Sequence, residues 1–293
     1  MTTAISLPLR FRIGARTMFS VRRKLVRVGL SLDEAMAGEG IDLPVLPAAA
    51  DGYFVTSLPE AQLAALMARD DDTIALVRQR YARRYADLSG SFDDYLATFS
   101  GKSRSTLRRK VRKFAKLFGG TLDFRTYRTP DEMVEFHDLA RRLSAKTYQE
   151  KLLDYGLPED AEFVADMNRA AARDQVRGWL LFAEGKPVSY LYAPAGGDTL
   201  IYAYLGYDPA WSRHSPGTVL LMEALRQIIE ESRFRRFDFT EGDGQQKRRF
   251  ATGKLDCADL LLLRRTPANR ALVTALSSFD RMVAFAKRLR AAE

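Results

Sequence analysis

The sequence is poor in the residues that bind transition metals and form covalent cross-links. It holds one cysteine, Cys257, and two histidines, His137 and His214, among 293 residues. A single cysteine excludes an intrachain disulfide and a zinc site built from cysteines, and it is typical of a reducing compartment. Two histidines exclude a histidine-rich metal site. We therefore expect no metal, and acid–base chemistry that relies on carboxylates, tyrosines, lysines or one imidazole.

Long apolar runs and targeting signals are also lacking. No apolar run approaches the roughly 20 residues that a membrane-spanning helix needs. The first residues, Met1-Thr-Thr-Ala4, have neither the basic segment nor the long apolar segment of a signal peptide. Together with the single cysteine, these features predict a cytoplasmic location.

Acidic residues are too few to balance the basic ones. The chain carries 46 Lys and Arg against 37 Asp and Glu, so its formal net charge is +9. This excess implies an acidic partner, which could be nucleic acid, anionic lipid or a phosphorylated cofactor. The length corresponds to one large domain or two ordinary domains of about 150 residues each.

Apolar periodicity and turn residues divide the chain into short strands and amphipathic helices. Strands are predicted over 9–13, 53–56, 73–88, 121–127, 179–184, 188–193, 199–207, 236–240 and 260–264. Helices are predicted over 92–99, 102–116, 129–153, 158–173 and 216–232, with others starting near residues 31, 57, 245 and 267. The three strands between 179 and 207 follow one another through two short turns, which is typical of successive antiparallel hairpins.

The helix predicted at 102–116 is the most charged part of the chain. It has eight basic residues and no acid, and its apolar residues Leu107, Val111 and Phe114 recur on one face. Such a helix suits contacts with nucleic-acid phosphates or with an anionic membrane surface. The alternative is a solvated basic face whose apolar stripe packs against the rest of the protein.

A second feature is the loop between the strand at 199–207 and the helix that begins at Pro216-Gly217. The N–H groups and the dipole at a helix start attract anions, and a glycine there lets a phosphate approach the backbone. The loop supplies further donors, and the sequence therefore predicts a pyrophosphate site made of Arg213, His214, Ser215, Pro216, Gly217 and Thr218. His214 could also act as a proton shuttle. The alternative is a helix start without a ligand.

The order of elements around this loop resembles the GNAT acyltransferase superfamily. Three antiparallel strands precede the loop, a long amphipathic helix follows it, and then come a strand at 237–243 and a short helix with Lys247. In that superfamily the pyrophosphate of acyl-CoA binds an Arg/Gln-x-x-Gly-x-Gly/Ala loop. The corresponding positions here are Arg213, Pro216 and Thr218, so the loop departs from the glycine pattern at its last two positions.

A narrower resemblance is to the CelD-type, cellulose-biosynthesis-associated branch of GNAT proteins, which is related to the Fem-type peptidyltransferases. It is carried by Gly206-Tyr-Asp-Pro, Ser215-Pro-Gly and Phe237-Asp-Phe-x-x-Gly-Asp243 with Lys247, and by the segment 88–95. It covers roughly residues 88–264. The resemblance implies an α/β (α+β) fold with a mixed, mostly antiparallel sheet flanked by helices. It further implies two GNAT-like halves, a reduced one at 1–100 and the acyltransferase domain at 101–293.

The resemblance implies an N-acyltransferase that moves an acyl group from acyl-CoA to an amine. Such a site must polarise the thioester carbonyl, deprotonate the ammonium of the acceptor and stabilise the leaving thiolate. In this fold, backbone N–H groups between two splayed strands act on the carbonyl, which places the site between 202–206 and 237–243.

Four side chains at this place are the candidates for catalysis. Asp243 and Glu241 are the candidate bases, and Tyr204 is the candidate proton donor to the thiolate. Lys247 could pair with Asp243, contact a phosphate or orient the acceptor. Alternation along the strand further predicts that Tyr202 and Tyr204 share one face and that Tyr207 lies on the other. A solvated turn, a surface ion pair and core packing are the alternative roles for these residues.

For the acceptor, the resemblance suggests a lipid amine such as a sphingoid base, as in ceramide synthases of GNAT type, or an amino sugar. A lipid acceptor favours an anionic membrane surface over nucleic acid as the partner of Lys102–Lys116, with the protein peripheral on the inner face of the membrane. Two other functions stay open. One is a Fem-like aminoacyl-tRNA-dependent peptidyltransferase, and the other is a non-catalytic basic protein that binds nucleic acid or membranes.

Overall fold

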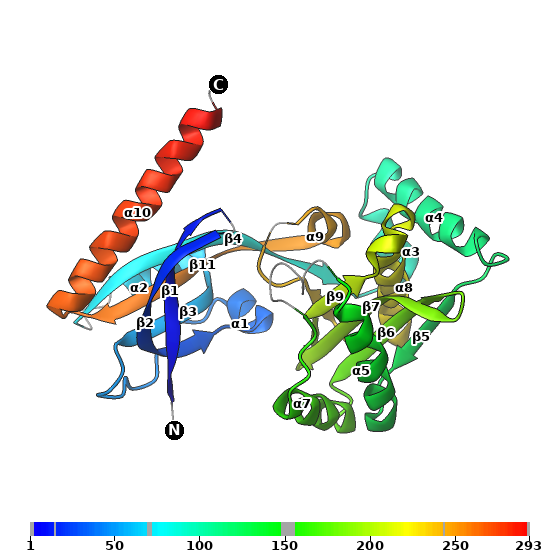
Figure 1. The fold of residues 1–293 in the computed structure, drawn as a ribbon, viewed down its shortest axis with the longest axis horizontal. Helices are drawn as coiled ribbons and strands as arrows, with labels where there is room; N and C mark the ends of the chain where they lie inside the picture. Colours follow the sequence, from blue (N-terminus) through cyan, green and yellow to red (C-terminus); the bar gives the residue numbers. More distant parts are fainter. Residues whose placement is uncertain (1–2, 15, 69–71, 148–155, 243, 292–293) are drawn as a thin grey trace. The chain divides into compact units, whose positions relative to one another are not determined.

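The computed structural model describes residues 3–14, 16–68, 72–147, 156–242 and 244–291, with side chains as far as residue 286. The chain forms two compact units (Figure 1). The first unit comprises residues 1–82 and 255–293, and the second unit comprises residues 83–254. The predicted halves that divide at residue 100 stay a prediction.

The first unit is built on a sheet with strand order β1-β2-β3-β11-β4, in which β2 and β3 run parallel. These strands are β1 (Ala4–Ile13), β2 (Arg16–Gly29), β3 (Gly52–Pro59), β4 (Thr73–Asp87) and β11 (Gly253–Arg264). The helices are α1 (Leu32–Ala37), α2 (Glu60–Met67) and α10 (Pro267–Ala291). One hydrophobic cluster joins Leu63 of α2 to Val55 of β3, and another joins Leu276 of α10 to Leu261 of β11. Alternate residues of the strands therefore supply two separate cores.

The second unit holds the region around the predicted site. Its strand order is β4-β10-β8-β7-β6-β5, with β9 paired to β7. The strands are β5 (Asp123–Tyr127), β6 (Val176–Ala183), β7 (Lys186–Gly196), β8 (Thr199–Ile201), β9 (Tyr204–Tyr207) and β10 (Arg236–Asp238). The helices are α3 (Phe92–Ala97), α4 (Gly101–Lys116), α5 (Pro130–Ser144), α7 (Ala161–Ala172), the 3₁₀ helix η1 (Pro209–His214), α8 (Pro216–Glu231) and α9 (Gln245–Phe250). The predicted mixed, mostly antiparallel sheet flanked by helices is confirmed.

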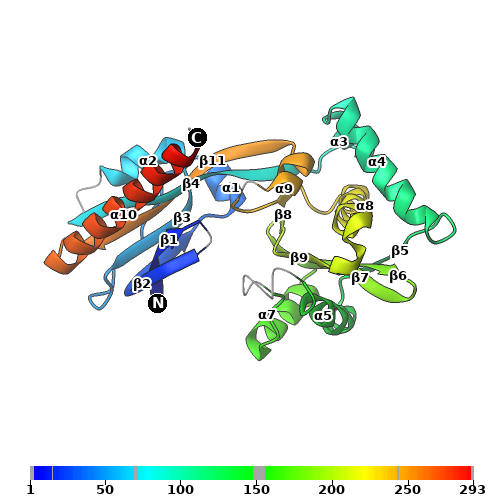
Figure 2. The same ribbon diagram turned by 45° about the horizontal axis from the view of Figure 1, so that its top comes forward.

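Helices cover both faces of this sheet. Figure 2 shows α8 on one side of the strands and α5 and α7 on the other. β6 is buried along its whole length, because Trp179 and Leu181 point into the core beneath α8 while Leu180 and Phe182 point into the core beneath α5 and α7. This period of two in a strand buried on both faces explains why its sequence reads as a continuous apolar run.

Sequence signals at the helix starts are confirmed in this unit. α5 begins with the predicted capping Thr129, whose side chain accepts from the N–H of Glu132, and with Pro130 in the first turn. The backbone N–H groups of Thr129 and Arg128 hold the pKa of the Glu132 carboxyl below its usual range. α5 was expected to continue to residue 153, but it ends at Ser144. Residues 148–153 of that expected helix lie outside the described residues.

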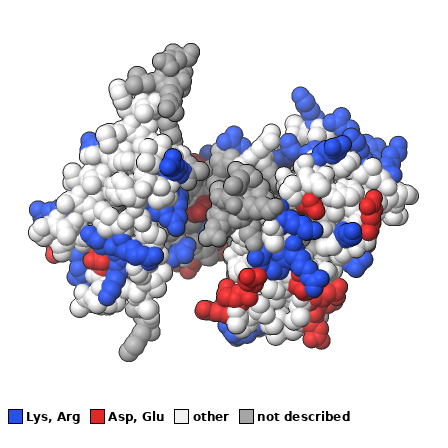
Figure 3. Space-filling view, in the orientation of Figure 1, with Lys and Arg blue, Asp and Glu red and all other residues white. Residues whose placement is uncertain are grey.

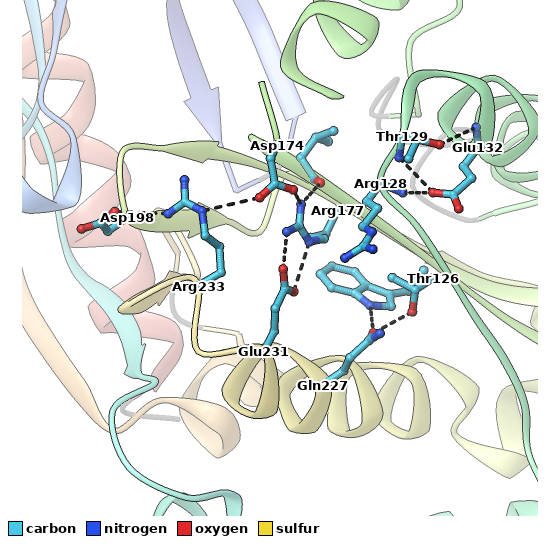
Figure 4. A network of polar contacts seen from close by, with 12 residues as sticks. Thr126, Arg128, Thr129, Glu132, Asp174, Arg177, Asp198, Gln227, Glu231 and Arg233 are labelled. Atoms are coloured by element: carbon cyan, nitrogen blue, oxygen red, sulfur yellow. Dashed lines mark hydrogen bonds and ion pairs between the residues drawn. The ribbon is translucent and has the colours of Figure 1, made fainter. Parts of the chain in front are cut away.

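A polar network fastens the C-terminal half of α8 to the sheet (Figure 4). Arg177 of β6 is 1% exposed and forms ion pairs with Asp174 and with Glu231 of α8. One turn earlier on α8, the side-chain oxygen of Gln227 accepts a hydrogen bond from Thr126 of β5 at 2.6 Å. A buried guanidinium that is held by two carboxylates restricts the geometry of the groups that pair with it. The network therefore fixes the position of α8, and with it the position of its N-terminus, relative to the strands.

Candidate functional site

The strand predicted over 199–207 is interrupted, and its two parts, β8 and β9, have different neighbours. β8 pairs in parallel with β10, with Ile201 opposite Asp238. The last link is the Tyr202 N–H, which donates to the Asp238 carbonyl at 2.8 Å. β9 then pairs with β7. The strand therefore leaves β10 after Tyr202, and the two strands part at the end of β10.

The interruption changes which faces the tyrosines occupy. Tyr202 packs against Phe237 and Phe239, in the core beneath α8. Tyr204 packs against Phe163 of α7 at 6.1 Å between ring centroids, in the core on the opposite face. The prediction that Tyr202 and Tyr204 share one face is therefore wrong, because strict alternation does not continue across the break between β8 and β9.

The backbone of β9 presents donors to the side away from β7. The Asp208 N–H donates to the Val188 carbonyl at 2.9 Å and so continues the β7–β9 ladder. Successive N–H groups of an antiparallel strand alternate between its two edges. The N–H groups of Leu205 and Tyr207 therefore point away from β7, toward the space left where β9 and β10 part.

The predicted pyrophosphate loop forms a helix start with an open backbone donor. Ser215 adopts left-handed backbone angles with φ +55° and does not cap α8 with its side chain. Pro216 has no N–H, and the N–H groups of Thr218 and Val219 both return to the Ser215 carbonyl. Among the first residues of α8 that the structure describes, Gly217 therefore has the backbone N–H that can bind a ligand. An oxyanion there would also meet the positive end of the α8 dipole.

Gly217 is tightly placed against the strand. A Cβ atom on Gly217 would lie 3.2 Å from Cδ2 of Leu205 and 3.5 Å from Cδ1 of Tyr207. The Gly217 carbonyl accepts a hydrogen bond from Nε2 of Gln246 in α9 at 3.3 Å. The helix start, β9 and α9 therefore meet at this glycine.

The other predicted residues of the loop surround this point. Arg213 is exposed, and His214, Ser215 and Thr218 are half-buried. The Nδ1 atom of His214 is buried without a hydrogen-bond partner among the described residues, and its ring lies 5.6 Å from that of Trp211. An unpaired buried polar atom is costly, so His214 has a donor or acceptor available beside the loop.

The basic helix α4 packs beside this loop. Trp211 of η1 contacts Phe114 of α4, and Phe118 just beyond the end of α4, at 6.1 and 5.9 Å between ring centroids. One turn before Phe114 lies Lys110, and burial together with the charges of Arg249 and Arg109 lowers its pKa. Like charges that act on one another in this way favour an anion near them. Lys110 and Arg249 extend the positive surroundings of the loop.

The apolar stripe of α4 is used inside the unit. Leu107 and Phe114 are buried, and Val111 and Phe118 are half-buried against the same core. The stripe therefore packs against the rest of the protein, as in the alternative of a solvated basic face, and α4 presents mainly cations to solvent. None of the helices in the described ranges combines the length and the apolar composition that spanning a bilayer requires.

Lys247 lies at the end of β10, where the strands part. Its Nζ donates to Oγ1 of Thr240 at 3.3 Å and to the carbonyl of Glu241, and it lies 5.8 Å from the ring centroid of Tyr202. Burial lowers the pKa of Lys247, and the carboxylates of Asp238 and Glu241 oppose that shift in part. The Glu241 side chain is exposed, and Asp243 lies outside the described residues.

A buried ion pair that has no direct signal in the local sequence supports this turn. Asp238 is fully buried and accepts two hydrogen bonds from Arg83 to one oxygen, at 3.1 and 2.6 Å. Its other oxygen accepts the Thr240 N–H at 2.8 Å. Thr240 has φ +60°, so this bond holds a backbone conformation that threonine rarely adopts. The alternation Phe237-Asp238-Phe239 hinted that Asp238 faces away from the phenylalanines, but Arg83 lies far away in sequence.

The structure thus brings most of the predicted residues together. Gly217, Gln246 and Lys247 connect the helix start to the end of β10, with Glu241 beside them. Tyr204 lies on the opposite face of the sheet from Tyr202 and Lys247. Within the described residues, no three side chains of the types that hold metals converge.

Comparison with known proteins gives one family match. The family model described as an acetyltransferase (GNAT) domain matches residues 101–248, which is half of the chain. Among curated proteins, none matches.

Solved structures with the same fold are distant in sequence. FemX is 10% identical with a TM-score of 0.53, over 93% of this chain and 91% of its own. The C-terminal domain of a putative lysylphosphatidylglycerol synthetase from Agrobacterium fabrum is 13% identical with a TM-score of 0.52, over 77% of this chain and 72% of its own. A conserved protein of unknown function from Bacteroides thetaiotaomicron is 17% identical with a TM-score of 0.50, over 72% of this chain and 69% of its own. At these identities the likeness concerns the fold.

Proposed function

Because the chain belongs to the acetyltransferase (GNAT) domain family, we propose that it transfers an acyl group from acyl-CoA to the nitrogen of an amine. GNAT domains generally use acyl-CoA as the donor. One observation carries the proposal for this chain: the strand leaves β10 after Tyr202, and its continuation β9 lies against the helix start at Gly217. A carbonyl-binding gap and a phosphate-binding helix start are then adjacent, as an acyl-CoA requires.

The α8 start would hold the pyrophosphate of the donor. The Gly217 N–H points from a helix start, and the hydroxyls of Ser215 and Thr218 and the guanidinium of Arg213 lie around it. Donors of this kind, together with the helix dipole, stabilise phosphate oxygens. Lys110 and Arg249 add positive charge on the side of α4. His214 offers its buried Nδ1 as one more polar contact.

The β9 backbone and Lys247 would carry the chemistry. The N–H groups of Leu205 and Tyr207 stabilise negative charge that develops on the thioester oxygen, because they are fixed by the sheet before the reaction begins. Lys247 takes a proton from the ammonium of the acceptor, and this requires its neutral form. Burial favours that form by lowering its pKa.

Three other assignments stay predictions. Glu241 is an alternative base through its exposed carboxylate, and Asp243 lies outside the described residues. Tyr204 as proton donor to the thiolate needs access from the face beneath α5 and α7. For the acceptor, a sphingoid base and an amino sugar both stay predictions, as does a Fem-like use of aminoacyl-tRNA.

Gly217→Asp tests the proposed binding site for the pyrophosphate of acyl-CoA at the start of α8. We expect it to raise the dissociation constant of CoA by at least about tenfold, because like charges placed together cost several kcal/mol. Isothermal titration of the purified protein with CoA measures this change. Gly217→Ala is the matched control, since its methyl group carries no charge, comes closest to the flexible end of Leu205, and meets Tyr207 and Ser189 at ordinary contact distances. We expect a much smaller loss for the control.

Two results would count against the proposed pyrophosphate-binding site. Equal losses for Gly217→Asp and Gly217→Ala would mean that crowding, not charge, controls binding. Absence of CoA and acyl-CoA binding to the wild-type protein at millimolar ligand would reject the acyl-CoA donor, and turnover with aminoacyl-tRNA under the same conditions would favour the Fem-like alternative.

A further inference from the structure

A groove of about 510 Å³ runs between α4 and α8, away from the α8 start. Four arginines line it: Arg104, Arg108 and Arg112 from α4, and Arg226 from α8. The three on α4 are spaced four residues apart, so they follow one face of the helix on successive turns. Figure 3 shows Lys and Arg side chains gathered over the region that α4 occupies in Figure 1.

The positive charge of the groove is only partly neutralised. Arg108 pairs with Asp93 at 3.1 Å, and Arg226 lies 3.6 Å from a carboxylate oxygen of Glu223. Arg104 and Arg112 have no acidic partner in the part of the chain that the structure describes. Surface pairs such as Arg108 with Asp93 are weak and exchange readily for another anion.

The residues around Arg226 orient its guanidinium and leave one of its donors available to a ligand. Its guanidinium lies over the ring of Phe92 at 4.9 Å, a contact that fixes the plane of the group. Its Nε atom is buried and has no hydrogen-bond partner among the described residues. A buried guanidinium donor without an acceptor costs free energy, and an oxyanion in the groove would supply that acceptor.

The shape of the groove indicates more than one anionic group. Arg104 and Arg112 are separated by eight residues, or about 12 Å along the helix axis, which exceeds the reach of a single phosphate. Val111 and Met222 add apolar contacts to the lining. Guanidinium groups bind phosphate oxygens in a bidentate manner, whereas the apolar residues suit the organic part of a ligand.

We propose that this groove is a second anion site, which binds a compound with two or more phosphate groups. It is distinct from the proposed acyl-CoA site at the start of α8. Met222 and Arg226 lie about 9 and 15 Å along the helix axis from the first residue of α8. The phosphates could belong to a soluble polyphosphate ester or to neighbouring lipid headgroups. Both sources present the same chemistry to the four arginines.

The test compares two double variants of α4 that remove the same charge. Arg104→Gln with Arg112→Gln removes two cations that line the groove, and Lys102→Gln with Lys113→Gln removes two exposed cations that do not. The probe is inorganic tripolyphosphate, titrated by calorimetry at physiological salt with saturating CoA present. We expect the groove variant to bind at least about tenfold more weakly, since hydrogen bonds to charged groups are each worth about that factor. The lysine variant should change far less.

A second arm separates the two sources of phosphate. Sedimentation with vesicles of phosphatidylglycerol, against vesicles of phosphatidylcholine, measures lipid binding by the same variants. Loss of vesicle binding in the groove variant alone supports the site and assigns it to lipid headgroups, whereas tripolyphosphate binding without vesicle binding supports it and assigns it to a soluble ligand.

Three results would overturn the proposal. Equal losses in the two double variants, with tripolyphosphate or with RNA, would indicate diffuse charge instead of a site. Loss of tripolyphosphate binding on addition of CoA would mean that the groove is part of the acyl-CoA site. Absence of binding to both tripolyphosphate and phosphatidylglycerol vesicles would leave the groove without a phosphate ligand. Unchanged melting temperatures would confirm that both variants are folded.

Discussion

Lys247→Met is expected to lower kcat/KM for acyl transfer by about 10²- to 10⁴-fold, the usual contribution of a positioned general base. Methionine keeps much of the length and apolar volume of lysine but cannot accept a proton. Because the proposed pyrophosphate-binding site lies at Gly217, the dissociation constant of CoA should change little. Lys186→Met is the matched control, because Lys186 is exposed at the start of β7 and should leave kcat/KM unchanged.

The pH dependence of the same reaction gives a second readout of Lys247. The base acts in its neutral form, which predominates above its pKa. Burial lowers that pKa from the ordinary value of 10.5. The wild-type rate should therefore rise with pH and level off below that ordinary value. Lys247→Met should remove this rise from the profile of kcat/KM.

Activity within a few fold of wild type in Lys247→Met would contradict the role of Lys247 as base. A pH profile that keeps the same rise in the variant would assign the titration to another group. Glu241 would then be the next residue to test, because its backbone carbonyl accepts from Lys247 and its carboxylate lies at the same turn.

Arg83→Met is expected to lower the free energy of unfolding by about 3–5 kcal/mol, the usual cost of leaving one member of a buried ion pair alone. Asp238 is fully buried and Arg83 is 6% exposed, so water cannot replace the lost partner. Both tryptophans of the chain, Trp179 and Trp211, lie in the second unit. Urea unfolding followed by their fluorescence therefore measures the stability of the unit that holds the pair.

Two further variants complete this test. Arg83→Met with Asp238→Leu should recover much of the lost stability, because no unpaired charge stays buried. Arg142→Met removes one member of an exposed pair with Asp138 and should cost no more than about 1 kcal/mol. A loss for Arg83→Met as small as that for Arg142→Met would mean that the buried pair does not support the turn at Thr240.

The helices of the second unit could be predicted because their signals are local. Residues close together in the sequence form the apolar stripes of α4 and α8 and the Thr129-Pro130 start of α5. β2 was not predicted, because basic residues such as Arg22, Arg23 and Lys24 obscure its alternation. Only the part of β2 near Leu25 and Val26 is buried, so a regular apolar pattern is not required of it.

The candidate site could be predicted in part, for the same physical reason. The helix start at Gly217 and the turn after β10 each have a local signature, and the structure joins them through Gln246. The break between β8 and β9 has no such signature, so alternation placed Tyr202 and Tyr204 on one face. Tertiary pairing also lies beyond local patterns, as the contact of Arg83 with Asp238 illustrates.

Acyl transfer from CoA to an amine nitrogen is the reaction proposed for this chain. Mass spectrometry of the products formed from acyl-CoA and a panel of lipid amines and amino sugars, together with an assay of released thiol, tests it most directly. The proposed reaction yields an amine whose mass has increased by the acyl group, with one free CoA for each product. Release of CoA without any acylated amine, or no release with any donor and acceptor, would contradict it.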